Sequence, residues 1–188
     1  IERREHEYQT TDGDALSKVI ISKYSDGEKT CYQEYWNGKE WLKNAPPSNE
    51  RTLYRAFYLS MLQSAPQAQK ERAIIYVVEG EKDVETLENL GQLATCNPMG
   101  AIKWNQPQYS ELLRGLNVVI LPDNDTKGRE HGKQVFQALQ GIAASVKIVN
   151  LWELMPSLPE KGDVTDYIEL GGDIAAIIAK VESTPIEE

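Results

Sequence analysis

From residue 74 onward, short apolar runs alternate with stretches in which apolar residues recur at helical spacing. A strand buried on both faces reads as a short continuous apolar run, and its alternation with helices is typical of a mostly parallel sheet covered by helices. We expect strands at residues 74–78, 93–95, 117–121 and 145–151. We expect helices at about 82–90, 108–114, 127–140, 165–170 and 173–181. Gly91 and Gly171-Gly172 follow the first and fourth of these helices and are expected to end them.

Carboxylates follow the apolar runs at three separate points of the chain. Glu79 comes directly after the first run, Asp123 and Asp125 follow the third, and Asp163 lies in a loop beyond the last. In open α/β sheets, ligands bind just outside the carboxyl ends of the strands. Acids gathered there repel one another unless a cation neutralises them, and Mg²⁺ prefers carboxylate oxygens. The sequence therefore predicts a magnesium site, and sites of this kind usually handle phosphates.

Two of these acids stand two positions apart. In an extended segment Asp123 and Asp125 point the same way, so they can share one or two cations. Two metal ions ~4 Å apart stabilise the attacking and leaving oxygens of a phosphoryl transfer. Gly128 keeps the following helix start open to a ligand. An alternative role for Asp125, compatible with the first, is to cap the helix that begins near Thr126.

Residues next to the acids are candidates for phosphate contacts. Gly80 lets a phosphate or a metal approach the backbone closely, and Lys82 and Lys161 can neutralise phosphate charge or serve as plain surface lysines. Asp83 falls in the first helical turn, where the helix dipole favours an acid in any case. Glu79 can bind metal, act as a general acid or base, or be a solvated acid at a strand end.

The N-terminal part reads differently. Residues 5–42 predict an antiparallel β-meander, because tight-turn dipeptides separate runs rich in β-branched and aromatic residues. These dipeptides are Asp12-Gly13, Asp26-Gly27 and Asn37-Gly38. Residues 44–49 read as a linker, 53–62 as a helix and 64–72 as a loop. We place a domain boundary within 63–72, which gives a small β-rich subdomain at 1–72 and an α/β domain at 73–188.

Four of the aromatic side chains in this meander lie near one another in its last part: Tyr32, Tyr35, Trp36 and Trp41. They suit a stacking surface for nucleic-acid bases. Simple aromatic packing on a small sheet is the more common outcome, and we favour it on the sequence alone.

The net charge of −9 lies entirely in residues 73–188, because residues 1–72 carry 11 basic and 11 acidic side chains. An acidic domain is a poor unaided binder of nucleic acid, since phosphate contacts dominate that affinity. Bound Mg²⁺ would reverse the local field. The charge therefore leaves a polynucleotide substrate open, provided that metal or flanking domains assist.

Other whole-chain features narrow the class of protein. Every apolar run is far shorter than the ~20 residues of a membrane-spanning helix, so we expect no membrane association. Cys31 and Cys96 form no CxxC pair, which argues against zinc in this chain, and two free thiols suit the cytoplasm. The chain starts at Ile1 rather than Met, so we expect a piece of a longer protein.

Taken together, three ordered motifs resemble the TOPRIM domain found in bacterial-type primases, type IA and type II topoisomerases, OLD-family nucleases and recombination mediators. The resemblance covers roughly residues 73–183. Its motifs here are Val-Glu-Gly-Glu-Lys-Asp at 78–83, Pro-Asp-Asn-Asp at 122–125 with Gly128 following, and Lys-Gly-Asp-Val-Thr-Asp at 161–166. They are most similar to primases and primase–helicases of phages, plasmids and integrated mobile elements. The expected fold is a TOPRIM-like (Rossmann-like) parallel sheet with helices, preceded by the β-meander and a helix.

The resemblance implies Glu79 as catalytic acid or base and Asp123 and Asp125 as catalytic Mg²⁺ ligands, with Asp83 and Asp163 as further acids. It implies nucleotidyl transfer for primer synthesis in DNA replication, with Mg²⁺ or Mn²⁺ as cofactor. The expected partners are a DNA template, nucleoside triphosphates and a helicase domain in the same or another chain. The alternatives are a Mg²⁺-dependent TOPRIM nuclease and a non-catalytic module that binds nucleic acid or a helicase. A generic dinucleotide binder is disfavoured because no GxGxxG follows the first strand.

Overall fold

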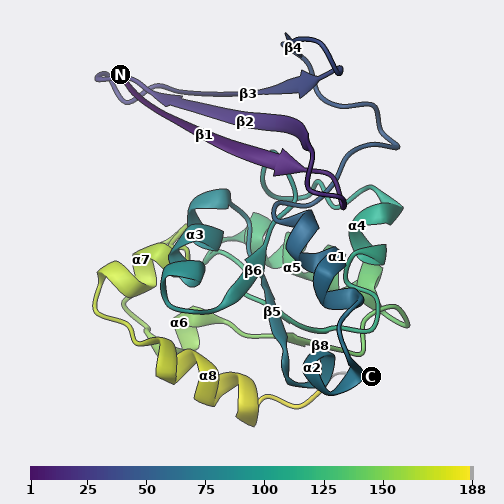
Figure 1. Cartoon of the computed structure of the whole chain (residues 1–188). Coiled ribbons are helices and arrows are strands. Elements are labelled where there is room, and N and C mark those ends of the chain that lie inside the picture. The colour runs from purple at the N-terminus through teal and green to yellow at the C-terminus, as the bar shows by residue number, and fades with distance from the viewer. Residues whose placement is uncertain (187–188) are drawn as a thin grey trace.

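The structure, a computed structural model, describes residues 1–186 and contains two separate sheets of four strands each (Figure 1). The strands are β1 (Glu2–Gln9), β2 (Ala15–Lys23), β3 (Lys29–Trp36), β4 (Trp41–Leu42), β5 (Ile74–Val77), β6 (Leu93–Thr95), β7 (Asn117–Ile120) and β8 (Ser145–Ile148). The helices are α1 (Ala56–Gln63), α2 (Gln67–Arg72), α3 (Glu81–Asn89), α4 (Pro107–Glu111), α5 (Thr126–Leu139), α6 (Leu151–Leu154), α7 (Val164–Glu169) and α8 (Ile174–Ser183).

The N-terminal sheet is antiparallel throughout, in the strand order β1-β2-β3-β4. Each of its three turns contains one glycine with a φ near 90°, which a residue with a side chain rarely adopts. These are Gly13, Gly27 and Gly38, the glycines of the three predicted turn dipeptides. The predicted meander is therefore confirmed.

The second sheet is fully parallel, in the order β6-β5-β7-β8. The chain runs from β5 outward to β6 and then crosses back to pair β7 with the other side of β5. The strand order thus reverses between β5 and β7, and this is the point at which open α/β sheets bind ligands. Gly91 and Gly171 adopt positive φ just after α3 and α7, as the sequence predicts for helix ends.

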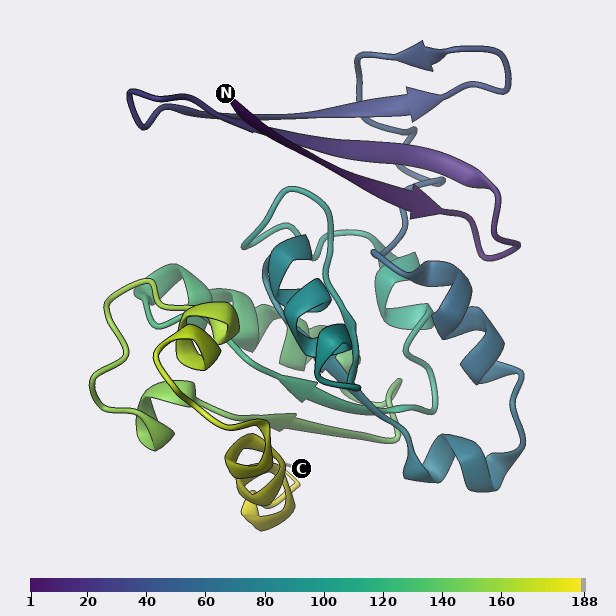
Figure 2. The same cartoon turned by 60° about the vertical axis from the view of Figure 1, so that its left-hand side comes forward.

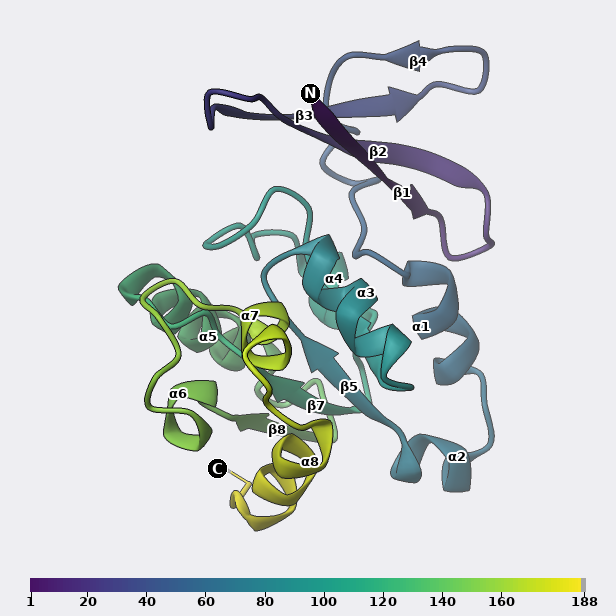
Figure 3. The same ribbon diagram turned by 90° about the vertical axis from the view of Figure 1, so that its left-hand side faces the viewer.

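Helices cover both faces of the parallel sheet (Figures 2 and 3). Tyr76 and Val119 face a core shared with α3, α6, α7, α8 and the inner side of the N-terminal sheet. Ile75 and Val118 face a second core built with α1, α4 and α5. The α/β fold with a preceding antiparallel sheet is therefore confirmed.

Three local predictions were wrong, and the helix expected at 108–114 (α4) ends early, at Glu111. Residues 64–72 read as a loop because they lack apolar periodicity, yet 67–72 form α2, a helix of good helix formers with no buried side chain. The strand expected at 145–151 ends at 148, because the chain turns at Asn150 into α6. The helix expected from residue 53 begins at 56, since Tyr54 instead donates its backbone N–H to Cys96 O at 2.9 Å.

Helix α1 lies on the N-terminal side of the predicted domain boundary, yet it packs in the same core as β5 and β7. The boundary itself stays a prediction, and residues 187–188 of the expected second domain lie outside the described residues. Over residues 1–186, no helix has the length and apolar character needed to cross a bilayer.

Candidate active site

Glu79 and Asp123 meet where the strand order reverses. Glu79 follows β5 by two residues, Asp123 follows β7 by three, and the two strands are paired neighbours. Glu79 Oε1 accepts a hydrogen bond from the Asp123 backbone N–H at 3.4 Å. The sequence prediction that these two acids lie side by side therefore agrees with the geometry.

Asp125 begins the helix that follows. It is the N-cap of α5, and its Oδ1 accepts the Gly128 N–H at 2.7 Å. Gly128 packs so closely that an added Cβ would lie 2.8 Å from both Asp123 N and Glu79 Oε1, and closer still to Asp123 O. Only glycine fits this position, because a methyl group would push apart the two chain segments that carry the acids.

Asn124 holds a third segment, residues 158–163, against the segments that carry Glu79 and Asp123. Its side-chain Nδ2 donates to the carbonyls of Leu158 and Pro159 at 3.0 Å each, and its backbone N–H donates to Gly162 O at 2.9 Å. These bonds hold the loop that carries Lys161 and Asp163 next to the Asp-Asn-Asp segment. Sequence reasoning missed this residue, and its position between two acids in a turn is the only signal for it.

Asp163 has structural contacts as well as its place near the other acids. It caps α7 reciprocally: Asp163 Oδ1 accepts the Asp166 N–H at 2.7 Å, and Asp166 Oδ2 accepts the Asp163 N–H at 3.2 Å. Lys82 Nζ lies 3.4 Å from Asp163 Oδ2. The lysine brings positive charge to the acid cluster, as a phosphate-binding role would require.

Asp83 lies in the protein interior, only 5% exposed. Thr165 donates its hydroxyl to Asp83 Oδ1 at 2.6 Å, and the Thr165 hydroxyl also shares a hydrogen bond with that of Thr86 at 2.8 Å. Asp83 therefore ties α3 to α7, and its role toward phosphate stays a prediction. Of the other phosphate candidates, Gly80 is the N-cap of α3, and Lys161 is exposed with a φ of 66°.

Glu79 and Asp123 hold protons more strongly than isolated carboxylates do. Burial raises the pKa of Asp123 to about 9, and the charges of Glu79 and Asp83 add to the rise. Burial also raises the pKa of Glu79 to about 7, with smaller contributions from Asp125 and Asp163 and an opposing one from the Asp123 N–H. Without a counter-charge, full ionisation of the cluster at neutral pH is unfavourable.

The chemistry of the donors fits a hard divalent cation. Glu79, Asp123, Asp125 and Asp163 offer only carboxylate oxygens, which Mg²⁺ prefers. Glu79 and Asp125 each accept a backbone N–H through one oxygen, whereas Asp163 accepts the Asp166 N–H through Oδ1 and contacts Lys82 Nζ through Oδ2. Within residues 1–186, no three acidic, histidine or cysteine side chains already converge as a metal-binding group. The four acids lie close together without forming a coordination shell, and their role as metal ligands stays a prediction.

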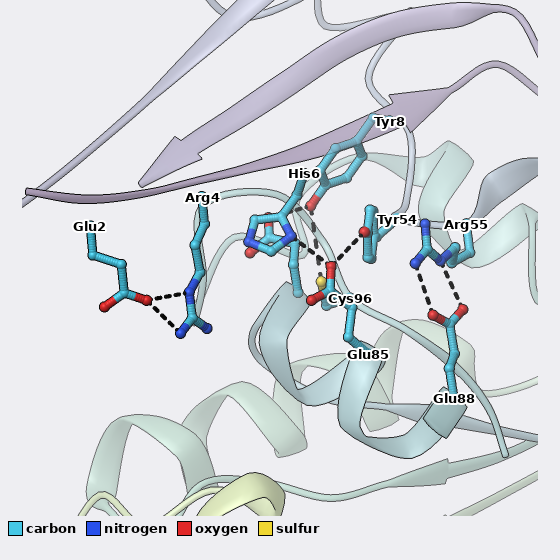
Figure 4. Close-up of polar contacts among 10 residues, drawn as sticks. Glu2, Arg4, His6, Tyr8, Tyr54, Arg55, Glu85, Glu88 and Cys96 are labelled. Carbon is cyan, nitrogen blue, oxygen red and sulfur yellow. Dashed lines mark hydrogen bonds and ion pairs between the residues drawn. The ribbon is translucent and has the colours of Figure 1, made fainter. Parts of the chain in front are cut away.

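The N-terminal sheet is fixed to the helix that starts just after the first acid of the site (Figure 4). Tyr8 of β1 donates its hydroxyl to Glu81 Oε1 at 2.7 Å. His6 Nδ1 lies 2.9 Å from Glu85 Oε1, and the Tyr54 hydroxyl donates to the same oxygen at 3.1 Å. Sequence reasoning missed these contacts, because they join residues about 30 to 80 positions apart with no shared motif.

Comparison with known proteins agrees with the motifs. Residues 74–153 match the family model described as the Toprim domain. This chain contains a TOPRIM domain. The match includes Glu79, Asp123 and Asp125, whereas Asp163 lies beyond it. Comparison with curated protein sequences gives no significant match.

Two solved structures share the fold of the TOPRIM domain and of the sheet before it. The Aquifex aeolicus primase (zinc-binding and RNA polymerase domains) aligns with a TM-score of 0.68 and 18% identity, over 100% of this chain and 41% of that one. The DnaG catalytic core aligns with a TM-score of 0.62 and 17% identity, over 98% of this chain and 53% of that one. At these identities the likeness shows the fold, and this chain spans about half or less of either structure.

Proposed function

We propose that the TOPRIM domain of this chain catalyses Mg²⁺-dependent nucleotidyl transfer as the catalytic part of a DNA primase from a phage or mobile element. The observation that carries this proposal is the contact between Glu79 and Asp123 at the strand-order reversal of a primase-type fold. The substrates would be a DNA template and nucleoside triphosphates, and the role would place the protein in the cytoplasm. A helicase domain, in the same or another chain, is the proposed partner.

Each acid has a distinct task in this proposal. Asp123, Asp125 and Asp163 would hold Mg²⁺, with Glu79 as a further ligand. Bound Mg²⁺, or Mn²⁺ in its place, would neutralise charge on the transferring phosphate, and catalysis of this kind rests mainly on positioning and charge neutralisation.

Glu79, Lys82 and Gly128 have further tasks in this proposal. Glu79, held beside the Asp123 backbone at the strand-order reversal, is the proposed group for general acid–base assistance. Lys82 would offset phosphate charge from its place beside Asp163. Gly128 leaves the space in which Glu79 and the Asp123 backbone remain in contact.

The test is synthesis of a complementary strand on single-stranded DNA, with nucleoside triphosphates and Mg²⁺. Asp123→Asn should abolish synthesis without lowering the unfolding temperature, because the neutral amide removes a buried carboxylate. Asp173→Asn is the matched control, because Asp173 caps α8 through the Ala175 N–H and takes no part in the acid cluster. Synthesis by Asp123→Asn at the wild-type rate would contradict the proposal.

The same assay separates the alternatives. Metal-dependent cleavage of DNA without incorporation of nucleotides would assign the acids to a nuclease. Neither synthesis nor cleavage, with nucleic-acid binding retained, would assign the chain to a non-catalytic binding module.

A further inference from the structure

The N-terminal sheet has an inner and an outer face, and strand register assigns each side chain to one of them. His6 and Tyr8 point from β1 toward α3, so the residues paired with them face inward. Tyr8 pairs with Ser17 of β2, and Ser17 pairs with Tyr35 of β3, so Tyr35 lies on the inner face. Cys31 of β3 contacts Met99 and lies on the same inner face. The alternate residues of β3 therefore face outward, and no other element of the described chain lies over that outer face (Figures 1 to 3).

Three aromatic rings gather on this outer face. Tyr32 and Trp36 alternate along β3, and Trp36 pairs with Trp41 of β4 at a ring-centroid distance of 5.4 Å. All three rings are partly exposed. Ile20, which pairs with Tyr32 on the same face, is fully buried, so the side chains of this face cover it while the three rings keep part of their own surface exposed.

Each end of this aromatic group has a lysine over a ring. Lys18 Nζ lies 4.5 Å from the Trp41 ring centroid, and Lys43 Nζ lies 4.4 Å from the Tyr32 ring centroid. A ring face that admits an ammonium group is also open to a flat nucleic-acid base. A lysine displaced by a base remains within reach of the phosphate that accompanies it.

We propose that Tyr32, Trp36 and Trp41, with Lys18 and Lys43, form a stacking surface for single-stranded nucleic acid, separate from the acid cluster. The surface lies on the side of the N-terminal sheet that faces away from the TOPRIM domain. This proposal rests on the proposed function in one respect: nucleic acid is chosen as the ligand because the protein is proposed to act on DNA. It would hold a strand outside the catalytic site and so extend the proposed role to strand retention.

The charge of the N-terminal sheet sets how a nucleic-acid strand would bind to it. Residues 1–72 are neutral overall, whereas the remainder carries the whole net charge of −9, so a polyanion is repelled least at the N-terminal sheet. Glu5, Glu7 and Glu34 lie on the same face, and Lys18 Nζ is 3.5 Å from Glu5 Oε2, so these acids offset the positive charge of the lysines there. Binding should therefore depend on stacking more than on charge. With two phosphate-contacting lysines, the slope of log K against log salt should be no steeper than about −1.4.

The test is a fluorescence titration of this chain with a short oligo(dT) in EDTA, so that the acid cluster and its metal play no part. Oligo(dT) should quench tryptophan emission saturably. An abasic oligomer and a duplex of equal length should bind at least about fivefold more weakly, because they present no free base to stack. Equal binding of the abasic oligomer would overturn the proposal, as would no binding of oligo(dT) at low salt.

Variants assign the binding to this face. Trp36→Ala and Trp41→Ala should each lower affinity about fivefold to a hundredfold, and the corresponding phenylalanine variants should retain most of it. Tyr58→Ala, which removes an aromatic side chain 58% exposed on α1, is the matched control and should bind as wild type does. Unchanged affinity in both alanine variants would overturn the proposal. The proposal would also be overturned if the chain does not bind oligo(dT) but self-associates, and if the alanine variants abolish that self-association. That result would assign the face to contact with a second copy of the chain.

Failure of this proposal and failure of the proposed function give different results. A chain that binds oligo(dT) in EDTA but synthesises nothing would contradict nucleotidyl transfer alone. A chain whose synthesis depends on Asp123, with no contribution from the outer tryptophans to binding, would contradict the stacking surface alone.

Discussion

Replacement of Gly128 by alanine tests the packing at the centre of the site. The new Cβ would lie 2.8 Å from Asp123 N and from Glu79 Oε1, and it would overlap the Asp123 carbonyl oxygen. Overpacking of this kind costs about 1–3 kcal/mol, and a clash with backbone leaves little room for relaxation. The better helix propensity of alanine returns about 1 kcal/mol. The difference is about 0–2 kcal/mol, and because the clash is with backbone we expect the upper half, a net loss of about 1–2 kcal/mol in the free energy of unfolding.

Gly132 provides the matched control on the same helix. Its added Cβ would meet the Pro122 side chain at 3.4 Å, which is ordinary contact, so Gly132→Ala should be neutral or stabilising by up to about 1 kcal/mol. The two variants should then differ by about 2 kcal/mol, or about 4–8 °C in unfolding temperature for a chain of this size. Urea and thermal unfolding measure both quantities. Equal stability of the two variants would refute the close packing described for Gly128.

Three further changes test other contacts. Burial lowers the pKa of His131 to about 4, below its unfolded value, so its contribution to stability is lost as pH falls. Relative to His131→Asn, wild type should lose about 2–3 kcal/mol between about pH 7 and 4.5 in urea unfolding, and parallel pH profiles would contradict this. Thr165→Val should cost about 1–3 kcal/mol because it leaves the buried Asp83 carboxyl without its hydroxyl donor, whereas Thr165→Ser should retain most of the stability. Gly172→Ala should cost about 1–3 kcal/mol because its Cβ would overlap the Tyr167 ring, and an unchanged unfolding temperature would refute that contact.

Local sequence signals predicted most of the fold. The two central parallel strands, β5 and β7, are mostly apolar on both faces, and the positions of all four strands were predicted to within one residue except at the end of β8. Three glycine turns predicted the antiparallel sheet. Helix α2 was missed because it buries no side chain and so shows no apolar periodicity.

In the candidate site, too, some contacts could be predicted from the sequence and others could not. Glu79 and Asp123 were predicted as neighbours because each follows a strand, and the carboxyl ends of parallel strands meet at one edge of the sheet. Asn124 and the Asp83–Thr165 pair were not predicted as contacts. These hydrogen bonds join residues about 34 to 82 positions apart, and only the packing of loops and helices decides which polar groups meet.

Calorimetric titration of Mg²⁺ into this chain tests the central claim most directly. We predict saturable binding by wild type and by Asp173→Asn, and loss of that binding in Asp123→Asn with no lowering of its unfolding temperature. Equal binding by all three proteins, or no specific binding by wild type, would contradict the assignment of these acids to a magnesium site.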